Sequence, residues 1–184
     1  MKFLVFILFA AFSSSAMAAQ PGLGFGDNPR LDELFATMQS AEGEGAESAE
    51  REVLRIFRQS GSPAMDLLYQ RGVRSIEQAD YPTAIWHFSA LIDHAPGFAE
   101  AYNGRATAFY LLGIYGESIS DIERTLALNP RQFGALMGLG AIYEGTDNLE
   151  AAYRSYKAAQ ALSPHSETIS ELVKRVEEQL FLVH

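Results

Sequence analysis

Apolar positions recur at helical spacing along most of the chain, and their arrangement returns with a fixed period. Pro96, Pro130 and Pro164 mark this period most clearly. A constant spacing of this size is typical of structural repeats that stack on one another, and such stacks present an extended surface more often than a catalytic pocket. Four further sets of positions keep the same spacing: Gly72, Ala106 and Gly140; Tyr81, Tyr115 and Leu149; Ala84, Ser118 and Ala152; and the bulky Phe88, Ile122 and Tyr156.

Each repeat divides into two helical halves separated by turn-forming residues. The breaks fall near Asp80, within 113–116 and within 146–148, where residues that favour turns gather. A proline then ends the second helix, because its nitrogen carries no hydrogen to donate. The predicted fold is therefore all-α, a solenoid of helical hairpins with three clear repeats at residues 65–98, 99–132 and 133–166.

Helical patterns also flank the three repeats. Residues 30–63 carry two short amphipathic stretches, separated by a Gly- and Glu-rich break at 42–46. One period before the first clear repeat falls near Leu31, so this pair is interpreted as a degenerate first repeat, atypical because one side faces water. Residues 167–184 form one helix with an apolar face and a charged face. We expect this helix to cover the end of the last repeat.

The N-terminus has the pattern of an export signal. Lys2 precedes the apolar run 3–12, and small residues lead to a cleavage site after Ala18. Ten apolar residues are too few to span a membrane, which takes roughly 20. The sequence thus predicts a signal peptide at 1–18, a flexible leader at 19–29 and an exported protein, periplasmic if the source is a Gram-negative bacterium.

Composition narrows the function classes. The chain has 184 residues, 48% of them hydrophobic, a net charge of −9 and no cysteine. The missing cysteine excludes disulfides, thiolate metal sites and a cysteine nucleophile. The acidic balance disfavours nucleic acid, whose binding needs a stripe of Lys and Arg.

The repeats resemble the tetratricopeptide repeat, with its pattern W-x-x-L-G-x-x-Y, A-x-x-x-F and P over about 34 residues. The second repeat matches more loosely, and the first has Ser75 where the family places an aromatic residue. In this family the small positions let the two helices of a repeat approach closely, so Gly140→Leu is expected to destabilise the fold. The third repeat carries the resemblance best, through Leu136, Leu139, Gly140, Tyr143, Ala152, Tyr156, Ala159 and Pro164.

The resemblance implies that the first helix of each repeat lines a concave face that binds peptides. Phe35 is expected to add to this groove, and Gly134 and Gly138 keep one end of it small. Some of the predicted groove residues could instead be packed core, Val73 and Ala141 among them. Tyr69, Asn103 and Tyr110 are the strongest candidates, because buried polar groups need a partner. The full predicted partner-binding set is Tyr69, Val73, Asn103, Thr107, Tyr110, Met137, Ala141 and Glu144.

The groove differs from that of the family's co-chaperones, which hold a partner's terminal carboxylate with Lys, Arg and Asn. Acidic Asp66, Glu100 and Glu144 instead favour a protein partner with an apolar and basic segment. The positions that match the carboxylate clamp hold Tyr69, Val73, Gly104, Gly134 and Gly138.

The favoured function is accordingly a non-enzymatic scaffold in the cell envelope, with no cofactor, no metal and no catalytic residue. One alternative is a structural protein that self-associates through Phe181 and Leu182 at the exposed end helix. The other is a histidine-based enzyme or metal carrier. His87 and His94 lie seven positions apart rather than at the spacing of a helical metal pair. The repeat architecture and the missing catalytic motifs favour the scaffold over both alternatives.

Overall fold

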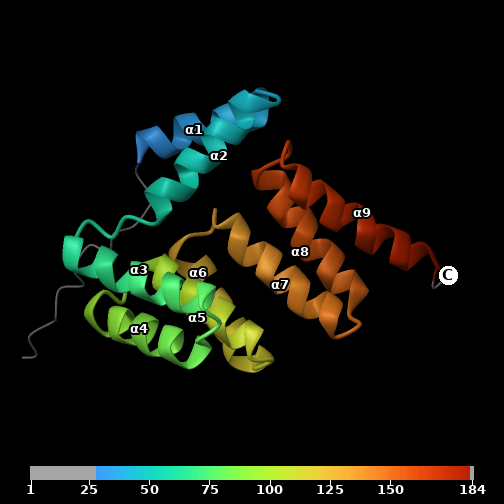
Figure 1. Cartoon of the computed structure of the whole chain (residues 1–184). Helices are drawn as coiled ribbons and strands as arrows, with labels where there is room; N and C mark the ends of the chain where they lie inside the picture. The colour runs from blue at the N-terminus through green and yellow to red at the C-terminus, as the bar shows by residue number, and fades with distance from the viewer. Residues whose placement is uncertain (1–27, 183–184) are drawn as a thin grey trace, which may run out of the picture.

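The computed structural model describes residues 28–182, and this part of the chain contains nine helices. Consecutive helices pair as antiparallel hairpins, which Figure 1 shows in chain order from blue to red. The prediction of an all-α solenoid is confirmed. The helices are α1 (Pro29–Ser40), α2 (Glu44–Phe57), α3 (Pro63–Glu77), α4 (Tyr81–His94), α5 (Ala99–Leu111), α6 (Tyr115–Leu128), α7 (Phe133–Gly145), α8 (Leu149–Leu162) and α9 (Glu167–Leu182).

The turns inside the three clear repeats share one backbone conformation. Ala79, Gly113 and Asp147 occupy the same position in successive repeats, and each has a positive φ, of 57°, 75° and 57° respectively. Glycine adopts this left-handed conformation without strain, whereas alanine and aspartate do so at a cost. The period seen in the sequence is therefore repeated in the backbone.

The residue after each of these turn positions is the N-cap of the next helix. The three repeats differ in whether its side chain caps that helix. Asp80 accepts a hydrogen bond from the Thr83 backbone N–H at 3.2 Å, and Asn148 accepts one from Ala151 at 3.3 Å. Such N-cap bonds satisfy a backbone donor at the start of a helix. Ile114 holds the same position before α6 and has no side-chain oxygen to offer. The second repeat is thus the one without this cap.

Small residues let the two helices of each repeat touch. A Cβ atom on Gly140 would overlap the ring of Tyr156, and one on Gly72 would lie 2.6 Å from Phe88. In the second repeat Ser118 donates a hydrogen bond to the Ala106 carbonyl at 2.8 Å. The close approach expected from the sequence is present in all three repeats.

The N-terminal pair α1–α2 packs against the third repeat instead of continuing the stack before α3. One end of the pair lies beside the turn between α8 and α9 in Figure 1, and α2 has little direct packing with α3. The apolar sides of α1 and α2 share one buried cluster with α7, α8 and α9, in which Phe35, Phe57, Phe133 and Tyr156 are the buried aromatic side chains.

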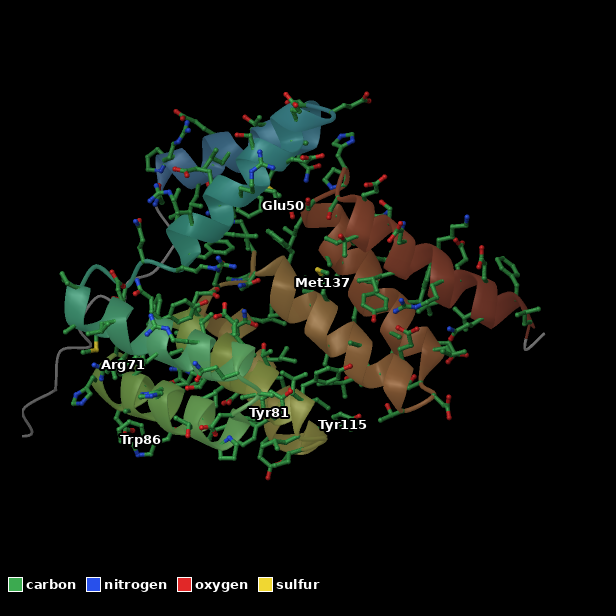
Figure 2. The ribbon with its side chains drawn as sticks, viewed as in Figure 1. Glu50, Arg71, Tyr81, Trp86, Tyr115 and Met137 are labelled. Carbon is green, nitrogen blue, oxygen red and sulfur yellow. The ribbon has the colours of Figure 1, made fainter. Side chains whose placement is uncertain are left out.

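Polar contacts fasten this arrangement. The Gln39 side chain donates to the Ala161 carbonyl at 2.8 Å. Ser163, in the turn before α9, donates to the Glu50 carboxylate at 2.6 Å. Figure 2 shows Glu50 on the side of α2 that faces this turn. The N-terminal pair thereby spans one edge of the solenoid, from the start of the first repeat to the end of the third.

Helix α9 covers the outer side of the third repeat. Ile169, Val173 and Val176 are buried against it. Arg175 adds a two-pronged ion pair with Glu144, with both N–O distances at 2.8 Å. The apolar face of the helix is thus covered, while Phe181 and Leu182 at its end are largely exposed.

Candidate functional site

A cleft of about 120 Å³ opens between α5, α6 and α7, where the second repeat meets the third. Its walls are mostly apolar or formed by small residues. The lining residues are Asn103, Ala106, Thr107, Tyr110, Ser118, Ile122, Gly134 and Gly138.

The cleft results from a difference in size between two equivalent side chains. Phe88 fills the space between the first and second repeats, and its ring is close enough to Gly104 that a Cβ there would lie 2.5 Å away. One period later, Ile122 and Gly138 replace this pair. A Cβ on Gly138 would lie 3.6 Å from the Ile122 side chain, an ordinary contact distance. The space that an aromatic ring fills at the first junction is therefore open at the second.

Three of the predicted groove residues come together at this cleft, all from α5. Asn103 donates to the Glu100 carboxylate at 3.4 Å, and the Thr107 hydroxyl donates to the Asn103 carbonyl at 2.9 Å. Tyr110 lies at the cleft with 36% of its surface exposed. These residues give the apolar cleft a polar wall and an accessible aromatic side chain.

Two further predicted residues, Tyr69 and Val73, line a separate recess of about 490 Å³ beside α3. Tyr69 also packs against Phe88 and Phe98, with both ring centroids 5.9 Å away. Burial raises the pKa of the Tyr69 phenol well above its ordinary value. Tyr69 is thus half-buried against the core, and it also borders the recess. The remaining lining residues are Arg58, Asp66, Gln70, Arg74 and Glu77.

Gly134 and Gly138 of α7 line the cleft as predicted, but the other three predicted residues of α7 lie outside both recesses. Met137 packs against the cluster formed with the N-terminal pair, and Ala141 is half-buried. Glu144 binds Arg175 and accepts a hydrogen bond from Tyr156 at 2.9 Å. The Arg175 guanidinium holds the pKa of Glu144 below its usual range. The structure thus gives Glu144 a role in attaching α9.

Two aromatic residues differ from their expected places. Phe35 is buried, and the Arg131 guanidinium lies 4.7 Å from its ring centroid, so Phe35 does not extend an open groove. Trp86, interpreted from the sequence as packing between repeats, is mostly exposed and contacts His87 edge to face at 5.0 Å. Phe35 is covered by Phe57 of α2, whose ring centroid lies 6.3 Å away, and by Arg131.

Glu100 is the unusual charged group near the cleft. Its side chain is buried and accepts hydrogen bonds from Gln132 and Asn103. Burial raises the pKa of this carboxyl, and the two hydrogen bonds counteract the rise only in part. The sequence placed Glu100 among the acidic groups of the groove, and the structure adds that it is not open to solvent.

Three cleft residues were not predicted from the sequence: Ala106 on α5, and Ser118 and Ile122 on α6. Their side chains were assigned to packing between helices, which is also what they do. The available signal was the smaller size of Ile122 compared with Phe88 and Tyr156 at the same repeat position. Across residues 28–182, no three His, Asp or Glu side chains are close enough to share a metal ion, and no helix is long and apolar enough to cross a membrane.

The sequence pattern of the tetratricopeptide repeat family matches residues 69–125 and 115–167, which together span more than half of the chain. This chain belongs to the tetratricopeptide repeat family. A TPR repeat-containing protein of Rhizobium etli is 33% identical over 82% of this chain and 74% of its own length. Tetratricopeptide repeat protein 36 of Mus musculus is 33% identical over 78% of this chain and 74% of its own length.

Solved structures of the family share the fold. The first TPR of Spaghetti (RPAP3), bound to HSP90 peptide SRMEEVD, superimposes with a TM-score of 0.60 at 23% identity, covering 63% of this chain and 92% of that chain. At this level of identity the likeness concerns the helical repeat architecture alone.

Proposed function

We propose that this TPR protein is a non-enzymatic scaffold that binds an apolar segment of a partner protein on the concave side, with one anchoring side chain in the cleft between α5 and α7. Its family consists of interaction modules, and the solved RPAP3 domain holds a peptide. Recognition would consist of burial of the anchor and hydrogen bonding, without bond making.

The observation that carries the proposal is the open space beside Ile122. An engineered apolar cavity of roughly 150 Å³ in another protein accepts benzene, so a cleft of about 120 Å³ suits one apolar side chain of similar size. Burying such a side chain stabilises a complex by about 1.5–3 kcal/mol. Asn103 and Thr107 at the wall would orient the partner's backbone.

The charge of the chain favours a partner segment that carries basic residues. The net charge is −9, and Glu117 on α6, one residue before the cleft-lining Ser118, is exposed. Opposite charges speed the encounter of two proteins and exclude wrong partners more than they set affinity.

The cell envelope is the proposed setting. This part of the proposal rests on the export signal at residues 1–18, which lies outside the described residues. A fusion of this predicted signal to a reporter that is active only after export would test it. Reporter activity that stays at the level of a leaderless fusion would contradict the export of this protein.

In-cell photo-crosslinking tests the groove. A crosslinkable residue at Tyr110 is expected to give a discrete adduct with another protein, because this side chain borders the cleft and is accessible. Glu123, exposed on α6 and absent from the cleft, is the control position. Adducts of equal yield from both positions, or none from 110, would contradict the proposal.

Ile122→Phe supplies a matched variant, since phenylalanine is the residue that closes the first junction. It should leave the helical content unchanged and abolish the adduct at position 110. Retention of the adduct in a folded Ile122→Phe protein would show that the cleft is not the binding site.

A second candidate function is self-association through the end of α9, where Phe181 and Leu182 are largely exposed. Replacing both with serine would reveal it. A mass that depends on concentration in the natural chain and not in this variant would favour this role.

A further inference from the structure

The turn between α5 and α6 presents an apolar surface to solvent. Leu111, Leu112 and Ile114 are 42%, 42% and 38% exposed. The corresponding turns of the other two repeats consist mainly of polar residues, at 78–80 and 146–148. A surface turn needs no apolar side chains for its own geometry, since Gly113 already supplies the left-handed residue.

Ile114 makes this turn more apolar but leaves the start of α6 without a side-chain cap, which lowers the stability of that helix. Its counterparts Asp80 and Asn148 both cap the helix that follows, whereas α6 lacks a side-chain cap bond. An exposed isoleucine at an N-cap position neither caps the helix nor fills the core. Contact with another molecule would bury this apolar side chain and offset the missing cap.

The apolar turn is continuous with the cleft through Tyr110. This residue lines the cleft, and its ring lies 5.9 Å from the ring of Tyr115 at the start of α6. From Asn103 at one end of the cleft to Leu111, the axis of α5 advances about 12 Å. Two turns of a partner helix span about 11 Å, so apolar residues seven apart on one face would reach both the cleft and the turn.

We propose that the cleft and the apolar turn form one two-part site for a basic amphipathic helix of a partner protein. This inference rests on the proposed function and names the kind of segment that the groove takes. One apolar side chain of the helix enters the cleft beside Ile122. A second, two turns along, covers Leu111, Leu112 and Ile114.

The charges around the site select the basic helix. The charged side chains from Tyr110 to Ile122 and from Gly138 to Tyr153 are acidic, and Arg105 of α5 is held in an ion pair with Asp121. Lys and Arg on the polar face of a helix would meet this acidic surround. Asp121 and Glu144 have arginine partners, while Glu117, Asp147 and Glu150 are exposed.

A second copy of the chain fits the site less well. It would bring another −9 of net charge to the same surface. The three exposed turn residues and Tyr110 together expose roughly 300 Å² of surface. This estimate takes about 200 Å² for each side chain, of which about two fifths is exposed. Stable interfaces bury about 800 Å² on each partner. The turn therefore serves as one part of a larger contact that includes the cleft.

The test uses the full mature chain and a fluorescein-labelled peptide of about 18 leucines and lysines, with leucines at positions i, i+3, i+4 and i+7 so that they form one face. Binding is followed by fluorescence anisotropy. Ile114→Asn should weaken binding about tenfold through loss of one apolar contact. The same change should raise Tm because it restores the cap, so weaker binding cannot be attributed to unfolding.

Matched controls separate this inference from the proposed groove. Leu67→Asn removes a similarly exposed leucine from α3, and binding should be unchanged. A peptide of the same composition without an apolar face, and one with glutamate in place of lysine, should bind weakly. Normal binding by Ile114→Asn together with weak binding by Ile122→Phe would overturn the two-part site and leave the groove in place.

Two other outcomes are also decisive. Normal binding by both variants would overturn the two-part site and the groove together. No binding of the amphipathic peptide to the natural chain, or equal binding of the peptide without an apolar face, would overturn the basic amphipathic helix as the occupant.

Discussion

Arg131 and Asp32 form an ion pair at 2.6 Å although they lie 99 residues apart in the chain. Arg131 belongs to the loop before α7, and its guanidinium also stacks over the ring of Phe35 on α1. One side chain thus makes both a charged and an aromatic contact that hold the N-terminal pair against the solenoid.

Arg131→Ala should reduce the free energy of unfolding by about 1–2 kcal/mol, mainly through loss of the stacking on Phe35. Asp32→Ala should cost less, about 0–1 kcal/mol, because Asp32 is largely exposed and surface ion pairs contribute little. Urea denaturation of the two variants measures both values. A larger loss for Asp32→Ala than for Arg131→Ala would reverse this order and refute the argument.

Gly140→Ala should destabilise the protein by about 1–3 kcal/mol, because the added methyl group would overlap the Tyr156 ring, which is buried and has no room to move away. Gly145→Ala is the matched control in the same helix, since nothing lies within 4 Å of its added Cβ. The control should be neutral or slightly more stable. Thermal denaturation distinguishes them, and equal Tm values would contradict the close approach of α7 and α8.

Glu144→Gln should reduce stability at neutral pH and have no effect at strongly acidic pH. The hydrogen bond from Arg175 is the main cause of the lowered pKa of Glu144. The stabilisation is therefore complete above the unfolded pKa of about 4.3 and is lost as the pH falls through the lower folded value. Urea denaturation at several pH values compares the variant with the natural chain. A difference that grows on acidification would contradict this assignment.

Glu100→Gln should show the opposite trend. Burial raises the pKa of Glu100, so the natural chain loses stability as the pH rises from about 4.3 through the folded value. The glutamine variant does not titrate, and its stability relative to the natural chain should therefore improve between about pH 4 and pH 7. Denaturant titrations at these two pH values test the sign, and a relative loss toward neutral pH would refute it.

The sequence predicts the repeats well because each helix of a repeat packs chiefly on its neighbours. The period that relates Gly72 to Gly140 also relates Phe88 to Tyr156, the rings that these glycines contact. The position of the N-terminal pair could not be predicted in this way. An apolar stripe such as that of α1 suits any apolar surface, and the surface that it meets is supplied by residues from far later in the chain.

The candidate site was predictable in part. Asn103, Thr107 and Tyr110 lie together because residues three or four apart share one face of a helix. Tyr69, Val73 and Glu144 occupy the matching positions of the other repeats, but their surroundings differ. Tyr69 packs against Phe88, Val73 lines the recess beside α3, and Glu144 binds Arg175. The cleft itself exists because the Ile122 side chain is smaller than the aromatic ring at the same position of the other repeats, and repeat spacing alone does not reveal this consequence. The binding roles of these residues remain predictions.

The contact of α1 and α2 with the third repeat changes how this chain should fold. In an open array each unit interacts with its neighbours alone, so unfolding can begin at either end and spread. Here the first helices depend on residues up to Ser163 for their packing. Helices α1 and α2 are synthesised first, but they can complete their packing only when nearly all of the chain has been made. On unfolding, the two ends of the solenoid should lose their structure together in a single cooperative transition.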